Sequence, residues 1–144
     1  MQTRLVLAFA LMVPSFLGAC GAAGSNHLIV GTWALDVGET LLLMGDEISD
    51  EDREEARNTL RSMQIRFIYN ADGTAVGQRG MGEETMANRG TYELMGEGEN
   101  LSVVITDMDS ETTPAPSNRM GVRFHGRDTL HLSENSMTFV LGRE

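Results

Sequence analysis

The stretch that decides the fold is Val30-Gly31-Thr32-Trp33-Ala34-Leu35-Asp36, which carries the only tryptophan of the 144 residues. Its side chains alternate as in a half-buried strand, because Trp33 and Leu35 fall on one face and their neighbours on the other. Gly31 has no Cβ, so another backbone or the indole itself can approach closely there. A large aromatic residue beside a glycine on a first strand suits a sheet that curls around and is closed at one end.

One helix is predicted after this stretch, over residues 49–63. Ser49 is a good N-cap, and the acidic residues that follow it suit the positive end of the helix dipole. Ala56, Leu60 and Met63 form a narrow apolar stripe at helical spacing. So narrow a stripe belongs to a helix that lies on the surface of another element.

From residue 64 onward the apolar residues recur at every second position, which is the period of a β-strand. A hairpin turn is predicted at residues 70–74, with Gly73 in the left-handed conformation, and loops at residues 80–88 and 107–118. Together with the Trp33 stretch this makes eight successive strands with short links. We therefore predict an all-β fold with one helix: an eight-stranded antiparallel up-and-down barrel, with the helix between strands 1 and 2 and no exposed edge.

The alternation predicts an interior of large apolar side chains, with almost no polar group besides the hydroxyls of Tyr69 and Tyr92. The predicted interior set is Trp33, Leu35, Ile65, Phe67, Tyr69, Tyr92, Leu94, Leu101, Val103, Ile105, Met120, Val122, Phe124, Leu130, Leu132, Met137, Phe139 and Leu141. A barrel of this size either fills itself with side chains or holds one small ligand. Both possibilities stay open at this point.

If a ligand enters, the helix and residues 41–44 are the natural lid, and Tyr69 and Tyr92 the expected polar contacts. The residues predicted to line the cavity or its lid are Leu42, Leu60, Phe67, Tyr69, Tyr92, Phe124 and Phe139.

The first residues have the anatomy of a signal peptide. Arg4 precedes an apolar run at residues 5–13, which is shorter than the about 20 residues that a membrane-spanning helix needs. The segment ends in Leu17-Gly18-Ala19-Cys20, which resembles the lipobox of bacterial lipoproteins. The resemblance implies cleavage after Ala19 and a diacylglycerol thioether on the Cys20 sulfur.

The same resemblance predicts location and domain boundaries. Glycine, and not aspartate, follows the cysteine, which in lipoproteins implies the outer membrane, with the domain facing the periplasm. Acyl chains on Cys20 would then hold the protein to that membrane. We expect a signal peptide at residues 1–19, a lipidated amino terminus and flexible tether at 20–28, and a barrel domain at 29–144.

The net charge restricts the kinds of partner that the chain can bind, and the cysteine content shows what stabilises its fold. The formal net charge is −10 and every basic residue is arginine. A field of this sign opposes nucleic acid, so we exclude nucleic-acid binding. Cys20 is the only cysteine, so the domain has no disulfide and must depend on its hydrophobic core.

Several short motifs together resemble the calycin superfamily, and within it the lipocalin-like domains of small bacterial lipoproteins. They are Gly31-Thr32-Trp33, residues 67–74, Gly90-Thr91-Tyr92 and Arg143 just beyond the last strand. The resemblance implies that Gly31 and Trp33 close the base of the barrel and that Arg143 packs across the indole. The helix at residues 49–63 departs from this pattern and is more like the portal helices of fatty-acid-binding proteins, whose carboxylate-holding Arg and Tyr have no clear match here.

No catalytic or metal-binding arrangement is predicted. The chain has no G-x-S-x-G motif, and its histidines on strands, His125 and His131, fall on the outward face with Arg123 opposite His131. The acidic run from Asp107 to Glu111 lacks the glycine and terminal glutamate of a calcium loop, and the methionines are spread singly over strands and loops. We expect no enzyme activity, no metal and no cofactor.

Two classes of function remain. The first is an outer-membrane-anchored lipoprotein that binds a small hydrophobic ligand in a lipocalin-like barrel. The second is a non-enzymatic periplasmic interaction or inhibitor module with a filled barrel core, for which the sequence names no protein partner.

Overall fold

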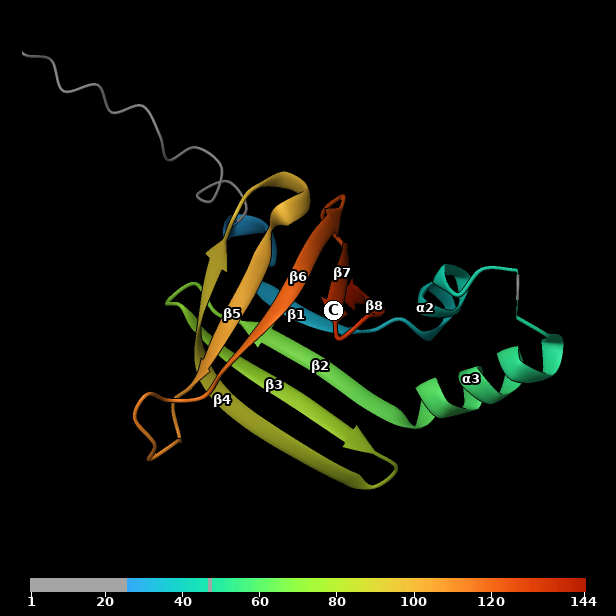
Figure 1. The fold of residues 1–144 in the computed structure, drawn as a ribbon, viewed down its shortest axis with the longest axis horizontal. Coiled ribbons are helices and arrows are strands. Elements are labelled where there is room, and N and C mark those ends of the chain that lie inside the picture. The colour runs from blue at the N-terminus through green and yellow to red at the C-terminus, as the bar shows by residue number, and fades with distance from the viewer. Residues whose placement is uncertain (1–25, 47) are drawn as a thin grey trace, which may run out of the picture.

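Antiparallel strands make up most of the computed structural model, which describes residues 26–46 and 48–144. The sheet is a closed barrel in which each strand pairs with the next and β8 pairs with β1 (Figure 1). The strands are β1 (Gly31–Leu35), β2 (Met63–Tyr69), β3 (Thr74–Met81), β4 (Glu84–Met95), β5 (Ser102–Asp107), β6 (Ser117–His125), β7 (Thr129–Glu134) and β8 (Met137–Arg143). The predicted eight-stranded antiparallel barrel is confirmed.

Two α-helices separate β1 from β2. The predicted helix is α3 (Asp50–Ser62), and its cap is the predicted one, because the Asp52 N–H donates to Ser49 Oγ at 3.1 Å. A shorter helix, α2 (Val37–Leu43), is not among the predicted elements. It is capped by Asp36, whose carboxylate accepts from the Glu39 N–H at 3.0 Å. A 3₁₀ turn, η1 (Gly98–Asn100), precedes β5, and residues 26–29 are helical.

The hairpin between β2 and β3 has the predicted turn. The Gly73 N–H donates to the Asn70 carbonyl at 3.1 Å, and Gly73 has a φ of +85°, a conformation that favours glycine. Asp72 also holds the turn, since its carboxylate accepts from the backbone N–H and the hydroxyl of Thr74 at 2.9 and 2.6 Å. These hydrogen bonds hold the pKa of Asp72 below its usual value.

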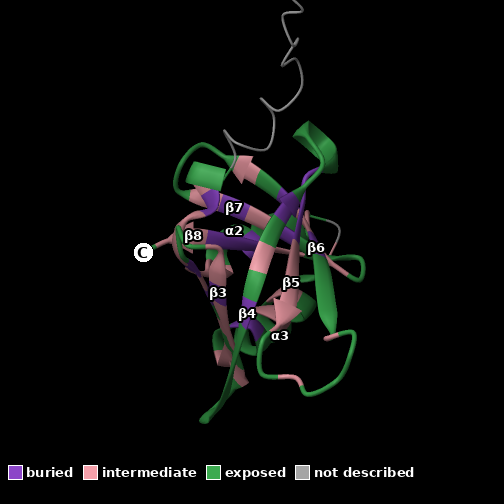
Figure 2. Cartoon of the chain, turned by 90° about the vertical axis from the view of Figure 1, so that its left-hand side faces the viewer, coloured by how far each residue is buried: buried purple, intermediate pink, exposed green. Residues whose placement is uncertain are grey.

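The predicted loop at residues 80–88 is wrong. β3 and β4 continue as one long hairpin, with Gly80 paired to Thr85 and Met81 to Glu84. Because β4 does not pair with β5 until Gly90, this end of the hairpin projects beyond the barrel, and residues 81–89 are exposed. Figure 2 shows the projecting end of β4 exposed. With neither face buried, these residues lack the apolar alternation by which a strand is recognised.

The core lies inside the barrel, and Trp33, Val103, Leu130 and Leu141 are fully buried in it. Nearly all of the predicted interior residues belong to the core or pack against it. Met137 is the exception, because it points inward but lies at the rim and is 58% exposed. Figure 2 shows how buried positions follow the middle of the strands. Two buried residues outside the predicted set, Ile29 and Ala75, complete the core.

The two ends of the barrel differ. At the closed end lie Trp33, Arg143 and the β2–β3 turn, and here residues 26–30 enter the fold. At the open end lie the first residues of β2 and β8, the last residues of β3 and the helices α2 and α3 (Figure 1).

Candidate functional site

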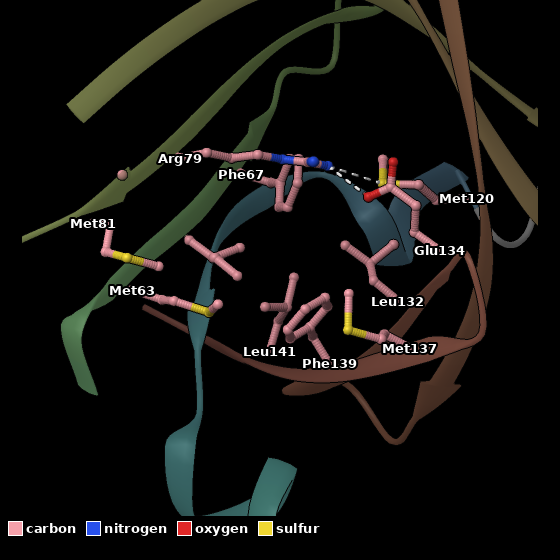
Figure 3. A pocket seen from close by; sticks show the side chains of 12 residues that line it. Met63, Phe67, Arg79, Met81, Met120, Leu132, Glu134, Met137, Phe139 and Leu141 are labelled. Atoms are coloured by element: carbon pink, nitrogen blue, oxygen red, sulfur yellow. Dashed lines mark hydrogen bonds and ion pairs between the residues drawn. The ribbon is translucent and has the colours of Figure 1, made fainter. Parts of the chain in front are cut away.

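A cavity of about 230 Å³ lies at the open end of the barrel (Figure 3). Its wall is mainly apolar and comes from strands far apart in the sequence. It is lined by Met63, Ile65, Phe67, Arg79, Gly80, Met81, Met120, Leu132, Glu134, Met137, Phe139 and Leu141. Flexible methionine side chains stand at the rim, and such side chains adapt their shape to an apolar ligand.

The cavity is accessible because β1 is short. β1 pairs with β2 only as far as Arg66 and with β8 only as far as Leu141, so the beginnings of β2 and β8 extend past it. Helix α2 packs beside β8 at this point. The Val140 N–H donates to Thr40 Oγ1 at 3.0 Å, and the Asp36 N–H donates to the Val140 carbonyl at 2.8 Å. These bonds satisfy the backbone N–H and carbonyl of Val140, at a point of β8 that β1 is too short to reach.

A second depression, the helix groove, runs between α2, α3 and the start of β8 and has a volume of about 610 Å³. Ala56 and Leu60 of the predicted apolar stripe line it. The groove shares Met63, Met137 and Phe139 with the cavity, so the two are neighbours across these side chains. An elongated apolar ligand can therefore continue from the barrel to the space under the helices.

Polar groups cross the inner side of the cavity. Arg79 on β3 forms an ion pair with Glu134 on β7 at 3.1 Å, and its guanidinium carbon lies 5.6 Å from the centre of the Phe67 ring (Figure 3). Asn118 donates to the other oxygen of Glu134 at 2.7 Å. The predicted interior has almost no polar group besides the tyrosine hydroxyls, and the inward side chains of Arg79 and Glu134 correct this prediction.

On the other side of Arg79 lies a third depression, the polar hollow, with a volume of about 260 Å³. Its polar lining includes Asn88 on β4, Asp107 on β5 and Asn118 on β6. The polar hollow and the cavity share Phe67, Arg79 and Met120. The mouth of the barrel is therefore mostly apolar toward β2 and β8 and carries more polar groups toward β4, β5 and β6.

The closed end is sealed by an aromatic ring under a cation. The Arg143 guanidinium carbon lies 4.3 Å from the centre of the Trp33 indole, and the indole N–H donates to the Ile29 carbonyl at 2.7 Å. A Cβ on Gly31 would overlap the Arg143 guanidinium, which explains the glycine at this position. The structure thus brings together Gly31, Trp33 and Arg143, the residues that the lipocalin resemblance names for the base.

The predicted polar contacts lie away from the cavity. The Tyr69 hydroxyl is buried, and among the described residues it has no hydrogen-bond partner. Burial raises the pKa of Tyr69, against a smaller lowering by Arg79, so its hydroxyl stays protonated at neutral pH. Tyr92 stands edge-on to Tyr69 and donates to the Asn70 carbonyl at 2.9 Å. Burial, followed by the charge of Asp72, raises the pKa of Tyr92.

Of the other predicted cavity and lid residues, Phe67 and Phe139 line the cavity and Leu60 lines the helix groove. Phe124 lies in the core, where its ring centre is 6.4 Å from that of Trp33. Leu42 does not serve as a lid residue, because it is 66% exposed on the outer side of α2. The lipobox residues Leu17, Gly18, Ala19 and Cys20 lie outside the described residues.

The polar residues that the sequence analysis missed could have been found by extending the strand alternation. Arg79 continues the inward series of Ala75 and Gly77, and Glu134 that of Leu130 and Leu132. Because the prediction followed apolar residues only, each series ended one position too early.

The histidine pair is on the outside of the barrel. The ring centres of His125 and His131 are 3.9 Å apart, and Arg123 pairs with His131 in the strand register, as predicted. Partial burial, then His125 and Arg123, lower the pKa of His131, with a smaller opposing effect of Glu39. Residues 26–46 and 48–144 contain no group of three or more His, Cys, Asp or Glu side chains that could hold a metal ion. Within the same ranges no helix is long and apolar enough to cross a membrane.

Comparisons of the chain with protein-family models, with curated proteins and with solved structures find no match.

Proposed function

We propose that this chain is a non-enzymatic binding protein that takes the apolar part of a small ligand into the cavity at the open end of the barrel. The observation that carries the proposal is the cavity itself, whose apolar wall adjoins the helix groove across Met63 and Phe139. Ligand sites are typically concave and mostly apolar, with a few placed polar groups. Arg79 and Glu134 supply such groups here.

We further propose that the protein is a lipoprotein of the bacterial outer membrane, lipidated at Cys20 and related to lipocalin-like proteins. The lipobox residues support the anchor. The arrangement of Arg143 over Trp33, on an eight-stranded barrel, supports the relationship.

Ligand binding is tested with the neutral apolar fluorophore N-phenyl-1-naphthylamine. The purified protein should bind it with a rise in fluorescence. Ile65→Trp, which fills the cavity, should abolish the signal, and Ile68→Trp, on the outward face of the same strand, should preserve it. If the parent protein gives no signal, or if Ile65→Trp binds as well as the parent, the barrel is not a binding site and the interaction-module alternative is favoured.

The anchor is tested by fractionating bacteria that express the full chain. The parent should be in the outer-membrane fraction, and Cys20→Ser, which removes the acylated sulfur, should leave that fraction. Gly21→Asp keeps the cysteine and should move the protein to the inner membrane. Retention of Cys20→Ser in the membrane would contradict lipidation.

A further inference from the structure

Strand alternation at the open end places five polar side chains on five consecutive strands around one side of the mouth. They are Arg79 on β3, Asn88 on β4, Asp107 on β5, Asn118 on β6 and Glu134 on β7. Polar side chains are usual where a barrel meets solvent, but here they line the mouth on the side of β3 to β7 and not on the side of β2 and β8. These residues therefore bear on what part of a ligand lies there.

We propose, resting on the proposed function, that the ligand is an amphipath with an uncharged, hydroxyl-rich head. The apolar chain occupies the cavity and the head occupies the polar hollow. Because the two depressions meet at Phe67, Arg79 and Met120, a single molecule can occupy both.

The charges of the site determine the nature of the head. Glu134 already neutralises Arg79, and its second oxygen is taken by Asn118. The other cation of the hollow, Arg89, pairs with Asp109 at 3.3 Å. A ligand carboxylate would therefore meet cations that already have partners, and it would also face the carboxylates of Asp107 and Glu134.

The amides of Asn88 and Asn118 favour a head that both donates and accepts hydrogen bonds. Each asparagine offers a carbonyl acceptor and at least one N–H donor, since Asn118 gives one of its two to Glu134, and a hydroxyl group complements either kind. Both asparagines are exposed at the open end, so a head arriving from solvent can reach them. A neutral polyol head satisfies this set without adding charge.

The experiment compares three probes that share a nine-carbon alkyl chain: 1-monodecanoylglycerol, decanoate and nonyltrimethylammonium. Their dissociation constants for the purified protein are measured by calorimetry below the micelle concentration of each probe. We expect the neutral monoacylglycerol to bind at least about tenfold more tightly than decanoate, which meets only cations that already have partners. Tighter binding of the ammonium than of the monoacylglycerol, drawn by the carboxylate of Asp107, would overturn an uncharged head. Equal or tighter binding of decanoate would overturn the inference.

Two variants test the residues. Glu134→Gln leaves Arg79 without a carboxylate partner and should raise the affinity for decanoate about tenfold. Glu93→Gln removes the same charge from an exposed outward position of β4 and should change nothing. Asn88→Leu should weaken monodecanoylglycerol about tenfold and leave N-phenyl-1-naphthylamine binding intact. If Glu134→Gln and Glu93→Gln behave alike, the inference is wrong.

Failure of this inference is distinguishable from failure of the proposed function. If the naphthylamine binds but the three probes do not, or do not differ in affinity, only the head assignment is wrong. If the naphthylamine also fails to bind, the cavity is not a ligand site at all.

Discussion

Arg143 shows how one residue can hold the closed end of the barrel together. Besides lying over Trp33, it donates to the carbonyls of Leu28, Val30 and Arg127 at 2.7, 2.8 and 2.9 Å. These bonds tie the chain before β1 to the turn before β7. Hydrogen bonds from a charged donor are stronger than those from a neutral one, so the guanidinium links these segments through three strong bonds as well as through its contact with the indole.

We predict that Arg143→Met lowers the free energy of unfolding by about 2–4 kcal/mol, from the loss of charge-assisted hydrogen bonds and of the cation–π contact. The matched control is Arg127→Met, an exposed arginine of the adjacent turn, which should change it by less than about 0.5 kcal/mol. Urea denaturation followed by the Trp33 fluorescence measures both. Similar midpoints for the two variants would contradict a role for Arg143 in closure.

Tyr69 differs from Arg143 in hydrogen bonding, since its buried hydroxyl has no partner among the described residues. We predict that Tyr69→Phe leaves the unfolding free energy unchanged or raises it by about 1 kcal/mol, because no hydrogen bond is lost and a buried polar group is removed. Tyr92→Phe, which loses the bond to the Asn70 carbonyl, should lower it by about 0.5–1.5 kcal/mol. Thermal unfolding compares them, and a marked loss of stability in Tyr69→Phe would mean that its hydroxyl has a partner.

Helix α2 replaces a missing strand contact. Thr40 is buried, and its hydroxyl both accepts from the Val140 N–H and donates to the Val140 carbonyl, at 3.0 and 3.4 Å. We predict that Thr40→Val, which keeps the shape and removes the hydroxyl, lowers the unfolding free energy by about 1–3 kcal/mol, because it leaves a buried N–H unsatisfied.

Amide hydrogen exchange provides the local measurement for Thr40→Val, and the Val140 amide should lose protection. Thr91→Val, at an exposed position of β4 away from α2, is the control and should leave that amide unchanged. If Val140 stays protected in Thr40→Val, α2 does not seal the edge of β8.

Elements with a strong local signal could be predicted from the sequence. Ser49 predicted the start of α3, and its cap is present. Gly73 predicted the turn between β2 and β3, which the hydrogen bond between Asn70 and Gly73 closes. Elements whose stability is tertiary could not be predicted. Helix α2 is short and depends on its contact with β8, and the outer part of the β3–β4 hairpin buries neither face. In both cases the determining contacts lie outside the segment itself.

At the scale of the whole molecule, the alternation of apolar residues was enough to predict the closed barrel and nearly all of its core. The candidate site was only partly predictable. Phe67 and Phe139 could be predicted because they are apolar and lie at inward positions of their strands. Alternation shows whether a side chain points into the barrel, but not how far it lies from the barrel end, so it could not show that Met137 is at the rim. It also could not show where side chains fail to fill the barrel, because a cavity depends on the lengths of β1, β2 and β8 together.

The position of the amino terminus predicts how a lipidated chain would face its membrane. Residues 26–30 are fixed at the closed end by Trp33 and Arg143, and Cys20 lies only six positions before Asn26, a span of at most about 20 Å. β3, with its 8 residues, runs roughly 25 Å along its own direction from the 70–73 turn at the closed end to the 82–83 turn at the open end. If Cys20 is lipidated as proposed, the open end should therefore point away from the bilayer.

This orientation is measured with acylated protein in vesicles whose lipid heads carry a quencher. A fluorophore is attached through Ala71→Cys at the closed end or Glu83→Cys at the open end. In the acylated protein each variant would have a single reactive thiol, because acylation places the Cys20 sulfur in a thioether. We predict stronger quenching at position 71 than at 83, and none at either position when Cys20→Ser removes the anchor. Equal quenching of the acylated forms would mean that the tether lets the barrel turn freely. Reversed quenching would mean that the open end faces the lipid of its own membrane.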